Sequence, residues 1–421
     1  MDREKREKIL GWILIVLVAI LYFFANLQKV LIPGAVFDTL QQRYNVGAAE
    51  ITRLGAGFMY AYSIFQLVVG LIADRYCGAR AIAMGGIFFC AGSVISAFDM
   101  GLETLLVSRI ATGIGASVVY LSMVKMVTRL SASAYTFILG IMVLVGYSGS
   151  VAGGVPFVAA VEYFGYTAVM LTIGALTTVV YLLFLANCAV TTLPPVCRDV
   201  KLNLTPYIAS FKVRHNCCLW LTVAVGFSVF YSMQTVFGKK FLEDFAGMSA
   251  HTAGMVVSAT MIIASFNGFL MASVSRMCGN RRRGIMRFCG FGTLIGTLML
   301  FAAVFFDLRD GILPMAAWIL MAFAGNVSPI SVAVQRETND DGIFGTVLSI
   351  GNCLAYLFIA IIGGVSGMLM EVFPPQMSGD LRIYGRNSYM LLFGMLIVFG
   401  LISAIASLGL KESGGKRIEV K

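Results

Sequence analysis

Long apolar runs alternate with short polar stretches along almost the whole chain. Each run has about 20 residues, the length that an α-helix needs to cross the hydrocarbon core of a bilayer. The pattern predicts twelve spanning helices, over residues 10–32, 51–73, 81–99, 103–124, 135–158, 166–187, 218–238, 251–274, 285–306, 313–334, 344–370 and 388–410. The sequence therefore predicts an all-α, multi-pass membrane protein.

The composition supports lipid as the solvent of this chain. Of 421 residues, 59% are hydrophobic and only 12% are charged, whereas soluble domains carry about 25% charged residues. The net charge of +10 is spread along one predicted membrane face, so we expect no nucleic-acid partner. Only two histidines are present, and no nucleophile–base pair or metal-ligand cluster is visible. We therefore expect no enzyme, no catalytic residue, no metal and no cofactor.

The basic residues predict the orientation in the membrane. Twenty-two Lys and Arg residues fall on the side of the N-terminus and seven on the other side, with Lys29 and Arg109 left inside predicted spans. Because loops rich in Lys and Arg stay in the cytoplasm, both termini are predicted to be cytoplasmic. We expect an integral protein of the inner or plasma membrane.

The chain contains an internal repeat. At an offset of 201 residues, 42–80 lies over 243–281 without a gap, and several positions coincide. An offset near half the chain length is typical of transporters built from two related halves. We predict an N-terminal six-helix bundle over 1–187, a cytoplasmic linker over 188–217, and a C-terminal six-helix bundle with a short cytoplasmic tail over 218–421.

Three motifs carry a resemblance to a known family. They read Gly70-Leu-Ile-Ala-Asp74-Arg75-Tyr-Cys77-Gly78-Ala-Arg80, Arg109-Ile-Ala-Thr-Gly113-Ile-Gly115, and Gly149-Ser150-Val-Ala-Gly153-Gly154. The chain resembles the major facilitator superfamily of secondary transporters, with Ser150 where the family's third motif has proline. The resemblance implies twelve helices in two pseudo-symmetric bundles around a central cavity that opens alternately to either side.

The resemblance also implies roles for individual residues. In such transporters the acidic residue of the first motif, here Asp74, holds the cytoplasmic ends of the two halves together. We expect gating by Asp74 with Arg75, Arg80 and Arg129. Glycines inside spans let helix backbones approach closely in lipid. The helix-packing glycines are predicted to be Gly113, Gly115, Gly149, Gly153 and Gly154.

Two cations inside spans form the predicted substrate site. A cation buried in a span costs several kcal/mol unless it faces water, a partner or a ligand. Lys29 shares a helical stripe with Tyr22, Asn26 and Pro33, at steps of four, three and four residues. The predicted substrate-binding residues are Lys29, Arg109, Asn26, Tyr62, Gln66, Tyr231, Gln234, Asn352 and Tyr356.

The charge of this set favours an anionic substrate. No Asp or Glu lies at mid-membrane in any predicted span, so a cationic cargo would find no counter-charge. The family branches that carry organic anions and sugar phosphates similarly place basic residues in spans one and four. We expect a monomeric transporter of a small organic anion such as a carboxylate, sugar acid or phosphate ester. Substrate exchange, the membrane potential or protons would drive it.

Other interpretations remain open at this point. Lys29 lies late in its span and could extend its ammonium to the outer surface, and Arg109 could serve structure or coupling. The Gly149–Gly154 pattern is typical of proton-antiport exporters of drugs or metabolites, although the missing proline weakens that hypothesis. A transporter-like membrane sensor is the second alternative.

Overall fold

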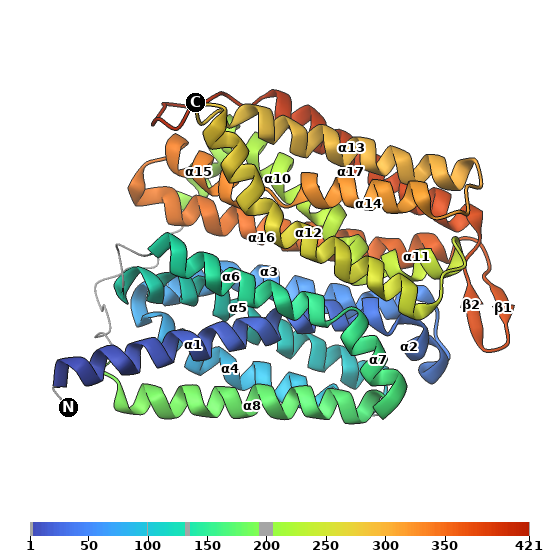
Figure 1. Ribbon diagram of the computed structural model, residues 1–421, viewed down its shortest axis with the longest axis horizontal. Coiled ribbons are helices and arrows are strands. Elements are labelled where there is room, and N and C mark those ends of the chain that lie inside the picture. Colours follow the sequence, from blue (N-terminus) through green and yellow to red (C-terminus); the bar gives the residue numbers. More distant parts are fainter. Residues whose placement is uncertain (1–2, 99, 131–134, 193–204, 421) are drawn as a thin grey trace. The chain divides into compact units, whose positions relative to one another are not determined.

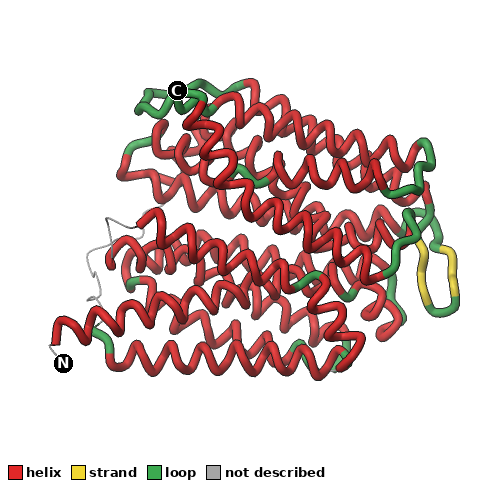
Figure 2. The backbone as a smooth tube through the Cα atoms, in the orientation of Figure 1, coloured by secondary structure: helices red, strands yellow, loops and turns green. Residues whose placement is uncertain are grey.

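The computed structural model describes the backbone of all residues except 1–2, 99, 131–134, 193–204 and 421. The side chains of those residues and of 3–4, 70–76, 125, 128–130, 135–137, 139 and 341–342 lie outside the description. Nearly all of the described chain is helical, and one two-stranded hairpin is the only sheet within it (Figures 1 and 2).

The elements before residue 191 are all helices. They are α1 (Arg3–Val30), α2 (Phe37–Tyr44), α3 (Ala48–Tyr76), α4 (Gly78–Ile95), α5 (Leu102–Leu130), α6 (Tyr135–Ala152), α7 (Val155–Phe164) and α8 (Tyr166–Val190). A turn over Leu31–Ala35 separates α1 from α2, because Ile32 has extended backbone angles, φ −125° and ψ 122°.

The second half of the chain begins with a short helix in the predicted linker. Its helices are α9 (Thr205–Lys212), α10 (Arg214–Ser232), α11 (Gly238–Asp244), α12 (Ala250–Met277), α13 (Arg283–Phe305), α14 (Ile312–Gly325), α15 (Ser328–Thr338), α16 (Asp341–Met370) and α17 (Arg386–Leu408). The antiparallel strands β1 (Gln376–Ser378) and β2 (Leu381–Ile383) lie between α16 and α17.

Ten helical stretches, some of which join consecutive elements such as α14 and α15, are long and apolar enough to cross a membrane, or eleven if α6 and α7, bent by 44°, form one span; only described residues enter this count. The predicted second span, 51–73, falls within α3. The break between α6 and α7 coincides with Gly153 and Gly154. Pro156 then stands in the first turn of α7, where its missing N–H costs nothing.

The internal repeat is visible in the structure. The segment Leu31–Ala35 and the short helix α2 recur as a π-helical segment at Met233–Phe237 followed by α11. These two pairs of elements are separated by 201 or 202 residues along the chain, which matches the offset of the sequence repeat. In each half, a distorted five-residue segment therefore precedes a short helix, although extended backbone angles occur only at Ile32 in the first half.

The chain divides into two compact units, residues 1–31 with 57–202 and residues 32–56 with 203–421. In the first unit α4 packs along α5, and α1 contacts α5, α6 and α8. In the second unit α10 contacts α13, α14, α16 and α17. The segment 32–56 precedes α4 in sequence but packs with the C-terminal helices. The predicted bundle boundaries, 1–187 and 218–421, stay predictions.

Small residues allow the close packing of α4 on α5. A Cβ atom at Gly115 would lie 2.3 Å from the backbone nitrogen of Phe89, and a Cβ at Gly92 would lie 2.6 Å from the backbone oxygen of Ser108. No Cβ atom can be accommodated at such distances without moving a helix. Comparable contacts occur at Gly113, 2.4 Å from the Phe58 oxygen.

We predict that Gly115→Ala lowers the free energy of unfolding by about 1–3 kcal/mol, the usual cost of overpacking. The added methyl group must separate α4 from α5. Gly394→Ala in α17 is the matched control, because nothing lies within 4 Å of its Cβ position. Thermal unfolding of both variants in detergent measures the difference, and equal midpoints would contradict this packing.

Candidate functional site

Lys29 and Arg109 are both enclosed by protein. Lys29 lies in the last turn of α1 and is 1% exposed, and Arg109 lies in α5 and is 0% exposed. The Lys29 ammonium lies 4.3 Å from the centroid of the Tyr62 ring, and the Arg109 guanidinium carbon lies 4.5 Å from the centroid of the Phe58 ring. The late position of Lys29 in its span therefore does not place its ammonium at the surface.

One helix supplies both rings. Phe58 and Tyr62 are four residues apart in α3, and their rings stack with centroids 6.1 Å apart and planes 15° from parallel. A cation over an aromatic face is attracted by the ring quadrupole, by about 0.5–2 kcal/mol depending on desolvation. This aromatic pair, Phe58 and Tyr62, thus provides successive faces for the two buried cations.

Gln28 holds Arg109 in place. Arg109 donates one hydrogen bond to the side-chain oxygen of Gln28 at 3.3 Å and another to its backbone oxygen at 2.9 Å. Gln28 is fully buried in α1, next to Lys29 in the chain. Since guanidinium can only donate, the Gln28 amide oxygen must face it. No pattern in the sequence predicts this pair, because Gln28 lies outside the helical stripe of Lys29.

Two other predicted site residues in the first unit donate hydrogen bonds to backbone oxygens. The Asn26 amide donates to the Tyr22 oxygen at 2.9 Å within α1, and the backbone oxygen of Asn26 accepts from Ser150 at 3.3 Å. Gln66 in α3 donates to the Ser117 oxygen of α5 at 3.3 Å. Gln66 thus has the interhelical role that single amides often have in membrane helices, whereas the Asn26 amide bonds within its own helix.

The predicted site residues of the second unit form a separate group. Tyr231 stacks on Phe227 with centroids 5.0 Å apart, and Tyr356 meets the same ring edge-on at 6.0 Å. Gln234 lies in the turn after α10 and donates to the Thr260 hydroxyl at 2.7 Å. Asn352 is half-buried in α16.

Most of the predicted gating residues have side chains outside the described part of the structure. The side chains of Asp74, Arg75 and Arg129 lie outside the described residues, and Arg80 is half-buried at the start of α4. Among the predicted packing glycines, a Cβ at Gly149 would lie 2.1 Å from the Phe23 oxygen, and one at Gly153 would lie 3.1 Å from Val30. Gly154 precedes α7 as its N-terminal flanking residue.

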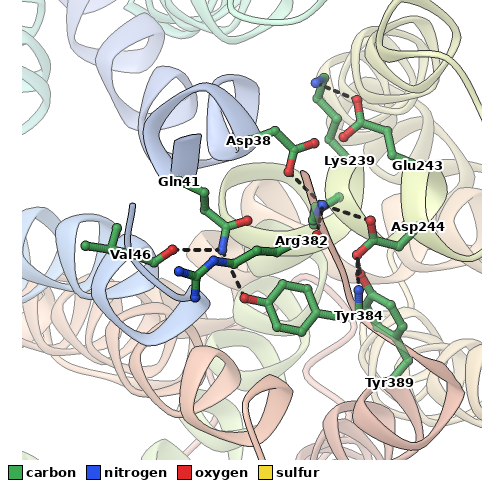
Figure 3. Close-up of polar contacts among 10 residues, drawn as sticks. Asp38, Gln41, Val46, Lys239, Glu243, Asp244, Arg382, Tyr384 and Tyr389 are labelled. Carbon is green, nitrogen blue, oxygen red and sulfur yellow. Dashed lines mark hydrogen bonds and ion pairs between the residues drawn. The ribbon is translucent and has the colours of Figure 1, made fainter. Parts of the chain in front are cut away.

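A polar cluster in the second unit, where α2, α11 and the start of α17 meet, had no counterpart in the sequence prediction. Lys240 of α11 forms ion pairs with Asp38 of α2 at 2.6 Å and with Asp244 at 2.8 Å (Figure 3). The backbone N–H of Tyr384 and the hydroxyl of Tyr389 both donate to the Asp244 carboxylate. Only the four-residue spacing of Lys240 and Asp244 was readable in advance.

Within the parts of the chain that the structure describes, no group of three or more His, Cys, Asp or Glu side chains is placed to hold a metal ion. In the first unit the described residues place two buried cations, Lys29 and Arg109, beside aromatic faces and an amide. Cations of this kind attract anions by charge.

Comparison with known families identifies the chain. The family model described as Major Facilitator Superfamily matches residues 18–364. The chain belongs to the major facilitator superfamily. The family consists of transporters, so the expectations of a multi-pass membrane transporter rather than an enzyme, and of this fold class, are confirmed.

Solved structures of the same superfamily cover nearly the whole chain. A bacterial homologue of the human lysosomal transporter Spinster, in an inward-facing and unoccupied conformation, matches with a TM-score of 0.72 and 16% identity, over 95% of this chain and 96% of that chain. A D-xylose–proton symporter matches with a TM-score of 0.68 and 16% identity, over 97% and 99%. At these identities the likeness shows the fold alone.

Curated relatives cover less of the chain. The chloroplastic ascorbate transporter of Arabidopsis thaliana is 25% identical over 177 residues, 41% of this chain and 32% of the relative. A chloroplastic sodium-dependent phosphate transport protein of the same plant is 24% identical over 179 residues, 42% and 35%. A chloroplastic probable anion transporter of Oryza sativa subsp. japonica is 24% identical over 176 residues, 41% and 30%. The matched region thus spans about a third of each relative.

We predict that Gln28→Leu lowers the free energy of unfolding by about 1–3 kcal/mol, the cost of a buried donor that loses its acceptor. Gln28→Glu keeps an acceptor at the same place and adds a counter-charge, so it should be at least as stable as the parent protein. Chemical unfolding of the two variants in one detergent measures this. An equal loss of stability in both variants would show that the side-chain oxygen of residue 28 is not what stabilises Arg109.

Proposed function

We propose that this transporter moves a small organic anion, such as a carboxylate, sugar acid or phosphate ester, by alternating access. The observation that carries the proposal is the pair of buried cations, Lys29 and Arg109, over the aromatic pair Phe58 and Tyr62. Burying two positive charges is costly unless they are used. The names of the three curated relatives mention ascorbate, phosphate and anions, which supports an anionic cargo.

The contacts of the two cations support different roles for them. Arg109 donates to two oxygens of Gln28 and is fixed between α5 and α1. Lys29 packs on a ring face. A cation over a ring gains about 0.5–2 kcal/mol, and a hydrogen bond to a charged group about 1.5–3 kcal/mol. An anion can therefore compete with the Tyr62 ring for the Lys29 ammonium. Arg109 would contribute positive potential and hold α1 in position through Gln28.

The predicted site residues of the second unit form an uncharged, hydrogen-bonding group. Tyr231, Tyr356, Gln234 and Asn352 combine aromatic faces with amide groups and carry no charge. Such groups suit hydroxyl-rich or planar molecules. Transport would be coupled to substrate exchange, to the membrane potential or to protons. The carrier would be a monomer with both termini in the cytoplasm.

We predict that Lys29→Gln reduces kcat/KM for anion uptake by about 10-fold to 100-fold, which corresponds to the loss of one charged contact. Uptake of radiolabelled ascorbate and of inorganic phosphate into proteoliposomes measures it. Lys29→Arg should retain more activity than Lys29→Gln. Arg309→Gln, at an exposed position paired with Asp307, is the control.

The same assay separates the rival functions. Uptake by Lys29→Gln at the parent rate would remove the proposed site. Export of hydrophobic cations by the parent, with no anion uptake, would indicate a drug exporter. Binding of ascorbate without any uptake would indicate a sensor.

We also predict that Gln28→Glu lowers anion uptake by about 10-fold or more although the protein stays folded. The new carboxylate neutralises Arg109 and repels an anion at Lys29, an effect that grows in a low-dielectric interior. Competition between ascorbate and unlabelled phosphate in proteoliposomes reports the change in affinity. Unaltered affinity in this variant would restrict Arg109 to a structural role, whatever the result for Lys29.

A further inference from the structure

Lys240 joins three segments at the outer ends of the second unit. Its ammonium pairs with Asp38 of α2 at 2.6 Å and with Asp244 of α11 at 2.8 Å, and it donates to the backbone oxygen of Arg382 in β2 at 2.7 Å (Figure 3). An ammonium has three protons to donate. The Lys240 side chain is 2% exposed, so these three contacts replace its hydration.

The pairing with Asp244 belongs to the C-terminal half alone. Lys240 and Asp244 lie one turn apart in α11. The second oxygen of Asp244 accepts from the backbone N–H of Tyr384 at 3.0 Å and from the hydroxyl of Tyr389 at 2.8 Å. Asp244 thus contacts Lys240 in α11, Tyr389 in α17 and Tyr384 between β2 and α17, and its side chain is only 3% exposed.

Asp38 differs from Asp244 in each of these respects. It comes from α2, in the segment that connects the first two long helices, and its side chain is 24% exposed. If Asp38 moves away, water can hydrate its carboxylate, and Lys240 keeps Asp244 as its counter-charge. Breaking a buried ion pair is costly when one charge is left alone. Here release of Asp38 leaves no buried charge without an opposite charge.

Three weaker contacts accompany this pair along the same segment. The Gln41 amide donates to the Tyr384 hydroxyl at 2.9 Å, and burial raises the pKa of that phenol, which keeps it neutral. Arg382 donates to the Asn45 side chain at 3.2 Å. The Glu371 carboxylate accepts from the backbone N–H of Ala49 at 3.2 Å, where an anion is favoured by the helix dipole of α3.

We propose that the Asp38–Lys240 pair is a releasable clasp between the outer segment 37–50 and the C-terminal half. In the closed state Lys240 is shared between Asp38 and Asp244. When the outer side opens, Asp38 leaves with α2, while Lys240 and Asp244 stay together. The clasp joins α2 to α11, the two short helices that the internal repeat makes equivalent. The proposal does not depend on the charge of the cargo.

The other charged groups nearby allow a matched control. Lys239 and Glu243 form an ion pair at 2.8 Å within α11, one residue from the clasp, and do not bridge to α2. Removing Lys239 thus changes the local charge as much as removing Asp38 does, with opposite sign, but it leaves the Asp38–Lys240 contact in place. Glu371 and Arg382 also contact the segment, and neither pairs with Lys240 through its side-chain charge.

The experiment measures access to the buried face of α2. Leu40 is fully buried there, so a cysteine at this position is shielded while α2 is docked. Purified Leu40→Cys protein in lipid nanodiscs is treated with a hydrophilic maleimide, and the modified peptide is followed by mass spectrometry. This peptide readout separates position 40 from the native cysteines.

We expect Asp38→Asn to raise the labelling rate at position 40 by about ten-fold, equivalent to a shift of about 1.4 kcal/mol toward the open state. Asp38→Glu, which keeps the charge, should stay near the parent rate, and Lys239→Gln should stay within about two-fold of it. Parent-like labelling in Asp38→Asn would overturn the clasp, as would equal acceleration in Lys239→Gln. Size-exclusion profiles establish that each variant is folded, and Asp38→Glu labelled as fast as Asp38→Asn would also contradict the proposal.

Discussion

The constraint behind this structure is that a charge taken out of water needs a partner within the protein. Lipid offers none, and the low dielectric of the interior makes each unsatisfied charge expensive. The chain meets this constraint in two ways. Lys29 and Arg109 lie over the aromatic pair Phe58 and Tyr62, and two oxygens of Gln28 accept hydrogen bonds from Arg109. Lys240 is instead enclosed by two carboxylates and a carbonyl.

These two arrangements suit different tasks. Ring faces and an amide attract a cation through a quadrupole and a hydrogen bond, and neither carries a formal charge. Two carboxylates around one ammonium leave a net negative charge, and either of them can depart while Lys240 keeps a counter-charge. We therefore propose cargo recognition for the first arrangement and release of the segment 37–50 for the second.

Much of the fold was predictable from the sequence, because the length of an apolar spanning helix follows directly from the thickness of the bilayer. The repeat offset of 201 residues even anticipated the equivalence of α2 and α11. The site was less predictable. Lys29 and Arg109 stood out as cations within spans, but Gln28 and Phe58 did not, because a buried amide or phenylalanine has many ordinary uses. The Asp38–Lys240 pair joins residues about 200 positions apart, and no local pattern encodes such a contact.

The most direct test of the central claim, that the buried cations form an anion site, is the thermal stability of the purified protein with different small molecules. A ligand that binds only the folded state raises the unfolding temperature, by an amount that grows with the logarithm of ligand concentration above its Kd. The account predicts that ascorbate or inorganic phosphate raises the unfolding temperature, that Lys29→Gln abolishes this rise, and that neutral xylose has no effect. Stabilisation by xylose with none by either anion would contradict it.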